Sequence, residues 1–174
     1  MNLQIITTPQ IHLVQIPDSH NLNRQLLNRF KVLQGQQETQ RSHFFQGRFE
    51  NIYIERQHIP EILSLITTVE NIAKIILKSN APLRCGYWFN WMQPGHSTSL
   101  HTHEENDELL SAVYYVTAPD QSGDLLIGND PYTLRYRPVP GMLALFSPQL
   151  PHAVAVNASD QERLSIAFNI GLAS

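Results

Sequence analysis

The stretch GMLALFSPQLPHAVAVNASDQERLSIAFNI, residues 141–170, decides the fold class of this chain. It contains three short apolar segments, at residues 142–146, 152–156 and 162–170, and the residues between them include Pro, Asn, Ser and Asp, which favour turns. The residues between these segments do not show the spacing of apolar residues that is typical of a helix. Consecutive short strands joined by turns are typical of antiparallel β architectures rather than of alternating α/β folds.

The same pattern extends back to residue 83. Turn residues divide this half of the chain into eight extended segments, near residues 85–93, 98–103, 111–117, 124–128, 132–137, 142–146, 152–156 and 162–170. Eight short strands without intervening helices predict a β-sandwich or a jelly roll. No internal repeat is visible, which argues against a propeller or a solenoid.

The first 82 residues mix helix and strand patterns. A polar-capped helix is predicted over residues 20–34, followed by a polar loop over residues 34–40. A longer amphipathic helix begins near Pro60 and ends before Pro82, because its apolar residues recur at intervals of three and four. Short strands are expected at residues 3–6, 11–16 and 49–55.

A sheet is the only large partner for the apolar face of the longer helix. We therefore expect one domain over residues 1–174, in which residues 1–82 support a β core formed by residues 83–174.

Composition excludes several classes of protein. With 174 residues, 42% of them hydrophobic, the chain can bury a substantial core. A net charge of −3 and only 12 Lys and Arg residues give no footprint for nucleic acid. No apolar run reaches the roughly 18 residues that a membrane span needs, and the N-terminal residues lack the pattern of a signal peptide. A cytoplasmic location is expected.

Cys85 is the only cysteine, so no intramolecular disulfide can form, which fits a reducing compartment. Its place at the start of an apolar strand favours a small buried hydrophobe over a catalytic nucleophile.

Three histidines have the pattern of a metal site. Alternate residues of a strand point the same way, so His101 and His103 share a face, and His152 opens a later strand. Imidazole suits iron, copper, nickel or zinc. The remaining five histidines are expected to take no part: His12, His20, His43, His58 and His96.

The last predicted strand has one polar face. Arg163, Ser165 and Asn169 lie on it, whereas Leu164 and Phe168 lie on the opposite face. The polar face is either the solvated side of an edge strand, or a guanidinium and a hydroxyl that bind a carboxylate.

The order of these elements resembles the bacterial 2OG-Fe(II) oxygenase family, which is related to prolyl hydroxylases. The resemblance covers residues 86–170, about half of the chain. No single element is specific, and the resemblance depends on their shared order: Trp88-Phe89-Asn90, Pro94-Gly95, His101-Thr102-His103, Ser111 to Val116, Ser122-Gly123, Gly141 to Phe146, Pro151-His152, and Arg163 to Asn169.

This resemblance implies a mainly β fold, a double-stranded β-helix of the jelly-roll, cupin-like type, buttressed by N-terminal α-helices. It implies Fe(II) as cofactor, with His101 and His152 as ligands. His103 would be the third ligand, where most of the wider superfamily has Asp or Glu. Glu105 is the alternative to His103, because residues 103–105 also form an H-x-E motif.

The resemblance also implies 2-oxoglutarate as co-substrate, bound by Arg163 and Ser165 with Tyr115. Tyr114 points the opposite way and is expected to pack in the core. Possible pocket-lining residues are Trp88, Asn90, Trp91 and Asn169.

The implied activity is hydroxylation of a C–H bond in a small-molecule or peptide substrate, with release of succinate and CO2. Two alternatives stay open. One is a cupin-like three-histidine dioxygenase that does not use 2-oxoglutarate, and the other is a non-catalytic, ligand-binding member of the fold. The sequence indicates no membrane partner and predicts no oligomeric state.

Overall fold

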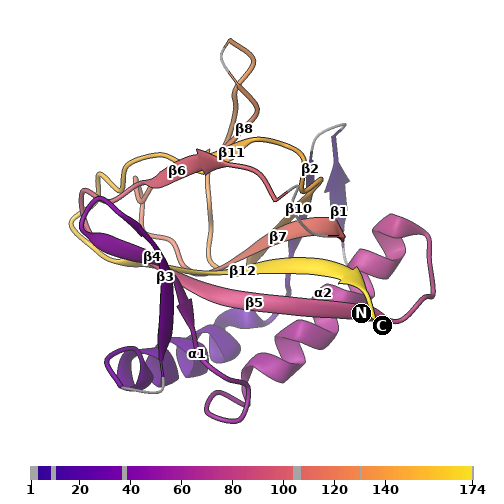
Figure 1. Cartoon of the computed structure of the whole chain (residues 1–174), viewed down its shortest axis with the longest axis horizontal. Coiled ribbons are helices and arrows are strands. Elements are labelled where there is room, and N and C mark those ends of the chain that lie inside the picture. Colours follow the sequence, from indigo (N-terminus) through magenta and orange to yellow (C-terminus); the bar gives the residue numbers. More distant parts are fainter. Residues whose placement is uncertain (1–3, 9–10, 37–38, 104–106, 130, 174) are drawn as a thin grey trace.

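The computed structural model describes residues 4–8, 11–36, 39–103, 107–129 and 131–173. Within these residues the strands form two antiparallel sheets, and two helices cover one of them (Figure 1). The eight-stranded sheet has the order β1 (Ile5–Thr7), β2 (Ile11–Gln15), β10 (Met142–Phe146), β7 (Glu108–Thr117), β12 (Arg163–Leu172), β5 (Leu83–Met92), β4 (Arg48–Tyr53) and β3 (Gln40–Phe45). The four-stranded sheet has the order β6 (Thr98–His101), β11 (His152–Val154), β8 (Leu125–Ile127) and β9 (Leu134–Tyr136).

From β5 onward the chain passes back and forth between the two sheets. β5, β7, β10 and β12 belong to the larger sheet, and β6, β8 and β11 lie between them in sequence but belong to the smaller one. This alternation is that of a jelly roll, the double-stranded β-helix. The predicted fold class is therefore confirmed.

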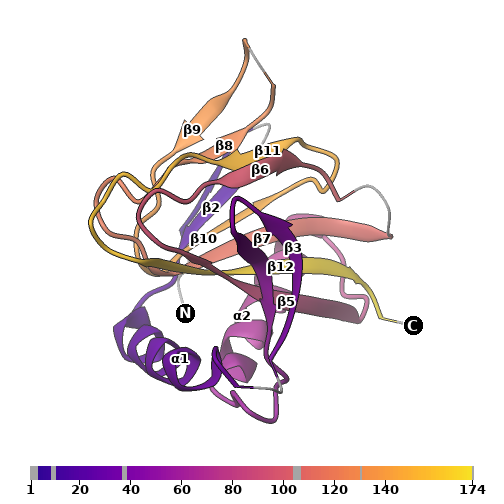
Figure 2. The ribbon, with the colours of Figure 1, turned by 60° about the vertical axis from the view of Figure 1, so that its left-hand side comes forward.

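The two helices lie on the outer side of the larger sheet, opposite the smaller sheet (Figure 2). α1 (Ser19–Leu33) contacts β7, and α2 (Ile62–Leu77) contacts β5. The buried face of α2 follows the three- and four-residue spacing predicted from the sequence. Its members are Ile62, Leu65, Ile66, Val69, Ile72 and Ala73.

Strand alternation divides β12 between two environments. Leu164, Ile166 and Phe168 belong to the main core under the helices. Arg163 and Ser165 point the other way, toward the smaller sheet, where they line a cavity. A second, smaller apolar cluster lies between the sheets and consists of Ile11, Leu125, Ile127, Ala144 and Phe146.

The eight strands predicted after residue 83 are all present, with boundaries that differ by a few residues. β3 was not predicted, because its sequence QRSHFF is polar and lacks clear alternation. It pairs with β4 as an antiparallel hairpin, and β4 joins the edge of the larger sheet. Within the described part of the chain, neither helix has the length and apolar character needed to cross a bilayer.

Phe30 on α1 tests the packing of the helices on the sheet. Its ring lies 5.0 Å from that of Phe89 on β5, and Phe30 is only 1% exposed. Phe30→Ala is expected to lower the free energy of unfolding by about 3–5 kcal/mol, because it leaves a cavity in the core. Urea unfolding measures this loss. The control is Val32→Ala on the same helix, where the side chain is 65% exposed and the expected change is within about 0.5 kcal/mol. Equal effects at the two positions would contradict the packing.

Candidate metal centre and anion-binding pocket

Three histidines converge between the two sheets. His101 ends β6 and His152 begins β11, and these residues are direct partners in the antiparallel pairing of the two strands. His103 lies two residues beyond β6, where its backbone N–H donates to the carbonyl of Pro148 (2.9 Å). One ligand atom of each histidine lies within 4.8 Å of those of the other two. The structure thus brings together the three residues that the sequence proposed as metal ligands.

Two of the rings are oriented by backbone carbonyls. Nδ1 of His101 lies 2.7 Å from the carbonyl oxygen of Ser99, and Nδ1 of His152 lies 2.9 Å from that of Leu150. A carbonyl only accepts, so Nδ1 carries the proton in both rings. In the neutral form of each ring, Nε2 then keeps its lone pair for a metal, which is the usual arrangement of metal-binding histidines.

Burial keeps two of the rings neutral. It lowers the pKa of His103 to about 4 and the pKa of His152 to about 3, and the neighbouring His101 adds to both shifts. At neutral pH both rings are therefore uncharged, as a metal ligand must be.

The histidines open onto a cavity of about 450 Å³ that extends to Arg163. Tyr115 from β7 and Ser165 from β12 also line it, and these two residues are cross-strand neighbours. A cavity of this size suits a small ligand beside a metal ion.

Arg163 is a buried cation that forms no ion pair with any of the described residues. It is 1% exposed, and its Nη1 donates to the backbone carbonyls of Ser122 (3.2 Å) and Gly123 (2.7 Å). Among the described residues, no carboxylate lies within ion-pair distance of it, and its Nε has no acceptor. A buried guanidinium is costly unless an anion accompanies it.

Tyr115 provides a second unpaired donor beside Arg163. The guanidinium carbon lies 5.3 Å from the centre of the tyrosine ring, and the buried hydroxyl has no hydrogen-bond partner among the described residues. Burial raises the pKa of Tyr115 to about 12, so the hydroxyl stays protonated and can donate. The donor set at this end of the cavity therefore fits a carboxylate.

Gly123 is needed for this arrangement. Its φ of +99° is unfavourable for residues with a side chain, and a Cβ there would lie 2.2 Å from the carbonyl oxygen of Ala155. The glycine thus lets the chain pass close to β11 while its own carbonyl accepts from Arg163.

The residues proposed as pocket lining divide into two groups. Trp88, Asn90 and Asn169 line the cavity. Trp91 does not, so that prediction was wrong. It is three residues from Trp88 on the same strand and therefore faces the opposite side, where its ring lies 5.9 Å from that of Phe30.

Tyr114 is buried on the helix side, and its hydroxyl donates to Asn23 on α1, as expected of a packing residue. Glu105, the alternative third ligand, lies outside the described residues.

The hairpin of β3 and β4 contributes cavity residues that the sequence did not reveal. The cavity is lined by His43 from β3 and by Glu50, Asn51 and Tyr53 from β4. His43 lies outside the cluster of three histidines, as expected, but it lines the cavity from β3, a strand that was not predicted. Alternation in β4 was the available signal for two of these residues, since Asn51 and Tyr53 share one face of the strand.

No protein-family model and no curated protein matches this sequence. Solved structures do match its fold. A prolyl hydroxylase from Trichoplax adhaerens, in complex with a hypoxia inducible factor oxygen degradation domain peptide fragment, aligns with a TM-score of 0.72 and 14% identity, over 94% of this chain and 84% of that one. The chain therefore shares the fold of this prolyl hydroxylase.

Two further solved structures match this chain with comparable TM-scores and sequence identities. EvdO2 from Micromonospora carbonacea var. aurantiaca, complexed with 2-oxoglutarate, gives a TM-score of 0.70 at 15% identity, over 99% of this chain and 94% of that one. The epimerase SnoN, in complex with Fe3+, alpha ketoglutarate and nogalamycin RO, gives 0.68 at 16% identity, over 92% and 79%.

Tyr115 and Tyr114 make a matched pair for testing the unpaired donor. Tyr115→Phe is expected to raise the free energy of unfolding of the ligand-free protein by about 1 kcal/mol, because an unpaired buried hydroxyl is costly. Tyr114→Phe is expected to lower it by about 1 kcal/mol, because it removes a buried hydrogen bond. Chemical denaturation compares the two variants. A loss of stability in both would mean that the Tyr115 hydroxyl is already paired.

Proposed function

We propose that this protein is an Fe(II)- and 2-oxoglutarate-dependent dioxygenase that hydroxylates a C–H bond of its substrate and releases succinate and CO2. The observation that carries the proposal is that Arg163 and Tyr115 each have a donor without a partner among the described residues, in the same cavity as three clustered histidines that could bind a metal. The fold supports it, since EvdO2 is complexed with 2-oxoglutarate and SnoN with Fe3+ and alpha ketoglutarate.

The histidines would hold the iron. Nε2 of His101 and of His152 would be two ligand atoms, and His103 would supply the third. Three protein ligands leave positions open for a chelating oxo-acid and for dioxygen. Iron bound there supplies the redox chemistry, and the protein supplies binding, orientation and exclusion of water.

Arg163, Tyr115 and Ser165 would hold the far carboxylate of 2-oxoglutarate. The guanidinium and the tyrosine hydroxyl both donate, and burial strengthens these bonds because little water competes. The oxo-acid group would then point along the cavity toward the histidines.

The substrate would bind against the part of the cavity wall that iron and 2-oxoglutarate leave free. Asn169 Nδ2 donates to Glu108, so its Oδ1 faces elsewhere and has no partner among the described residues, as is also true of the Ser111 hydroxyl. A small polar molecule or a peptide would suit these groups, and the Trichoplax enzyme is complexed with a peptide.

We further propose a cytoplasmic location, where Cys85 stays reduced.

The rival function is a three-histidine dioxygenase that does not use 2-oxoglutarate. The observation that favours it is the cluster of three histidines without a carboxylate among the described residues. The three-histidine dioxygenase function, however, gives no role to the donors on Arg163 and Tyr115 that have no partner among the described residues.

An anaerobic titration separates these functions. The protein with Fe(II) and 2-oxoglutarate is expected to show a weak visible charge-transfer band. Arg163→Met is expected to weaken 2-oxoglutarate binding by about 2 kcal/mol or more, roughly thirtyfold in Kd, because it removes the cation. Unchanged affinity in Arg163→Met would favour the three-histidine dioxygenase. No band at saturating iron and oxo-acid would favour a non-catalytic protein.

The third ligand is tested by two variants. His103→Ala is expected to lower Fe(II) affinity by at least about a hundredfold, more than the loss of an outer partner of a ligand. Glu105→Gln is expected to leave the affinity unchanged. Anaerobic competition with a chromophoric chelator measures both, and the reverse order of effects would assign the third position to Glu105.

A further inference from the structure

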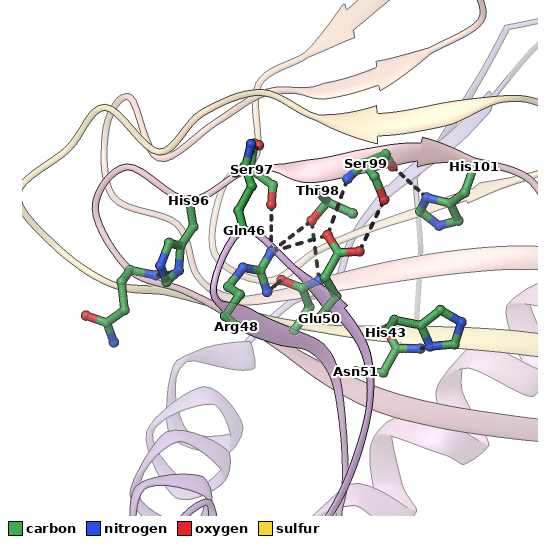
Figure 3. Close-up of polar contacts among 12 residues, drawn as sticks. His43, Gln46, Arg48, Glu50, Asn51, His96, Ser97, Thr98, Ser99 and His101 are labelled. Carbon is green, nitrogen blue, oxygen red and sulfur yellow. Dashed lines mark hydrogen bonds and ion pairs between the residues drawn. The ribbon is translucent and has the colours of Figure 1, made fainter.

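A buried ion pair contains one residue of the cavity wall, Glu50. Arg48 and Glu50, both on β4, are 9% and 6% exposed, and Arg48 Nη2 lies 3.6 Å from Glu50 Oε1. Figure 3 shows the pair facing the segment that leads to His101. Burying two charges is costly unless hydrogen bonds satisfy their remaining atoms. The partners of those bonds therefore indicate what the pair does.

Both oxygens of Glu50 accept from one residue. The backbone N–H of Ser99 donates to Oε1 (3.3 Å), and the Ser99 hydroxyl donates to Oε2 (3.2 Å). Ser99 belongs to β6, which carries His101 at its end. A carboxylate is suited to this task because both of its oxygens accept, whereas an amide offers only one acceptor.

Arg48 holds the two residues before Ser99. Its Nη2 donates to the carbonyl of Ser97 (2.8 Å) and to the hydroxyl of Thr98 (3.2 Å). Together the ion pair therefore contacts three consecutive residues of the chain that enters β6.

These contacts matter because β6 is the edge strand of the smaller sheet. Within the described part of the chain it pairs only with β11, so its other edge has no backbone partner. β4 belongs to the larger sheet, and its Arg48 and Glu50 side chains join the two sheets at this point.

The contacts of the ion pair with Ser99 extend to the imidazole of His101, a proposed metal ligand. The carbonyl of Ser99 accepts from Nδ1 of His101 (2.7 Å), so the residue that Glu50 holds at two atoms orients His101 with a third (Figure 3). A shift of Ser99 would turn or displace the imidazole.

We propose that Glu50, supported by Arg48, is a positioning residue for His101: by holding Ser99 it aims His101 Nε2 at His103 and His152. The proposal rests on the proposed function, because it presumes that the three histidines bind a metal. The partners of ligating histidines are commonly worth ten- to a hundredfold in metal affinity.

The test uses Co(II) alone as the probe, since its ligand-field spectrum reports coordination geometry without turnover. Glu50→Gln is expected to weaken Co(II) binding about tenfold and to change the spectrum. Ser99→Ala, which keeps the N–H and the carbonyl, is expected to have a smaller effect. The double variant should bind no more weakly than Glu50→Gln alone, because both changes affect one set of contacts.

Glu61→Gln is the matched control. Glu61 pairs with Arg29 at the start of α2, on the helix side of the molecule, and this variant should bind Co(II) as the parent does. The combined variant Arg48→Met with Glu50→Gln removes both charges and serves if the single change prevents folding. It should bind Co(II) at least tenfold more weakly than the parent.

Two results would overturn the proposal. A folded Glu50→Gln, or the combined variant, with the parent's affinity and spectrum would refute it while leaving the metal centre intact, even if thermal stability fell. Failure of the parent itself to bind Co(II) would instead remove the proposed function and this inference together.

Discussion

The fold depends on the packing of the two helices against the outer face of the eight-stranded sheet. The inner face of this sheet lines the cavity and stabilises the fold less. Strand alternation forces each central strand to present one face to α1 and α2 and the other to the cavity. On β12, Ile166 and Phe168 are fully buried beneath the helices, while Arg163 and Ser165 face the histidines. The apolar face contributes burial free energy, and the polar face costs part of it.

That cost is concentrated where a ligand is expected. Arg163 Nε and the Tyr115 hydroxyl are buried without a hydrogen-bond partner among the described residues, and each such group destabilises the ligand-free protein by roughly 1–3 kcal/mol. A bound carboxylate would satisfy both donors. The stability lost at this site in the ligand-free protein would then be returned as ligand affinity, which is the usual relation between stability and preorganised binding.

Local patterns were sufficient for most of the fold. Turn residues separated the strands after residue 83, and the spacing of apolar residues such as Leu65 and Val69 located the face of α2. The histidines and Arg163 were found because a strand's two-residue period can be read directly from the sequence. The same period places Trp91 opposite Trp88, and applying it would have avoided that error.

The contribution of the β3–β4 hairpin could not be read in the same way. β3 has a polar sequence, and it forms because β4 supplies its backbone partners. Glu50 reaches Ser99 across 49 residues of chain and between two sheets. Such contacts depend on the tertiary arrangement, which no local period encodes.

The charges of the residues that line the cavity affect how strongly iron and 2-oxoglutarate would promote each other's binding. Among the described residues that line it, Glu50 is the only carboxylate, and Arg48 pairs with it. Three neutral imidazoles would leave both positive charges of Fe(II) unbalanced, whereas a carboxylate in place of His103 would cancel one. In the proposed function, the dianion of 2-oxoglutarate would offer one carboxylate to Arg163 and one to the metal. Iron and co-substrate would therefore favour each other's binding more strongly here than in a centre that contains its own carboxylate.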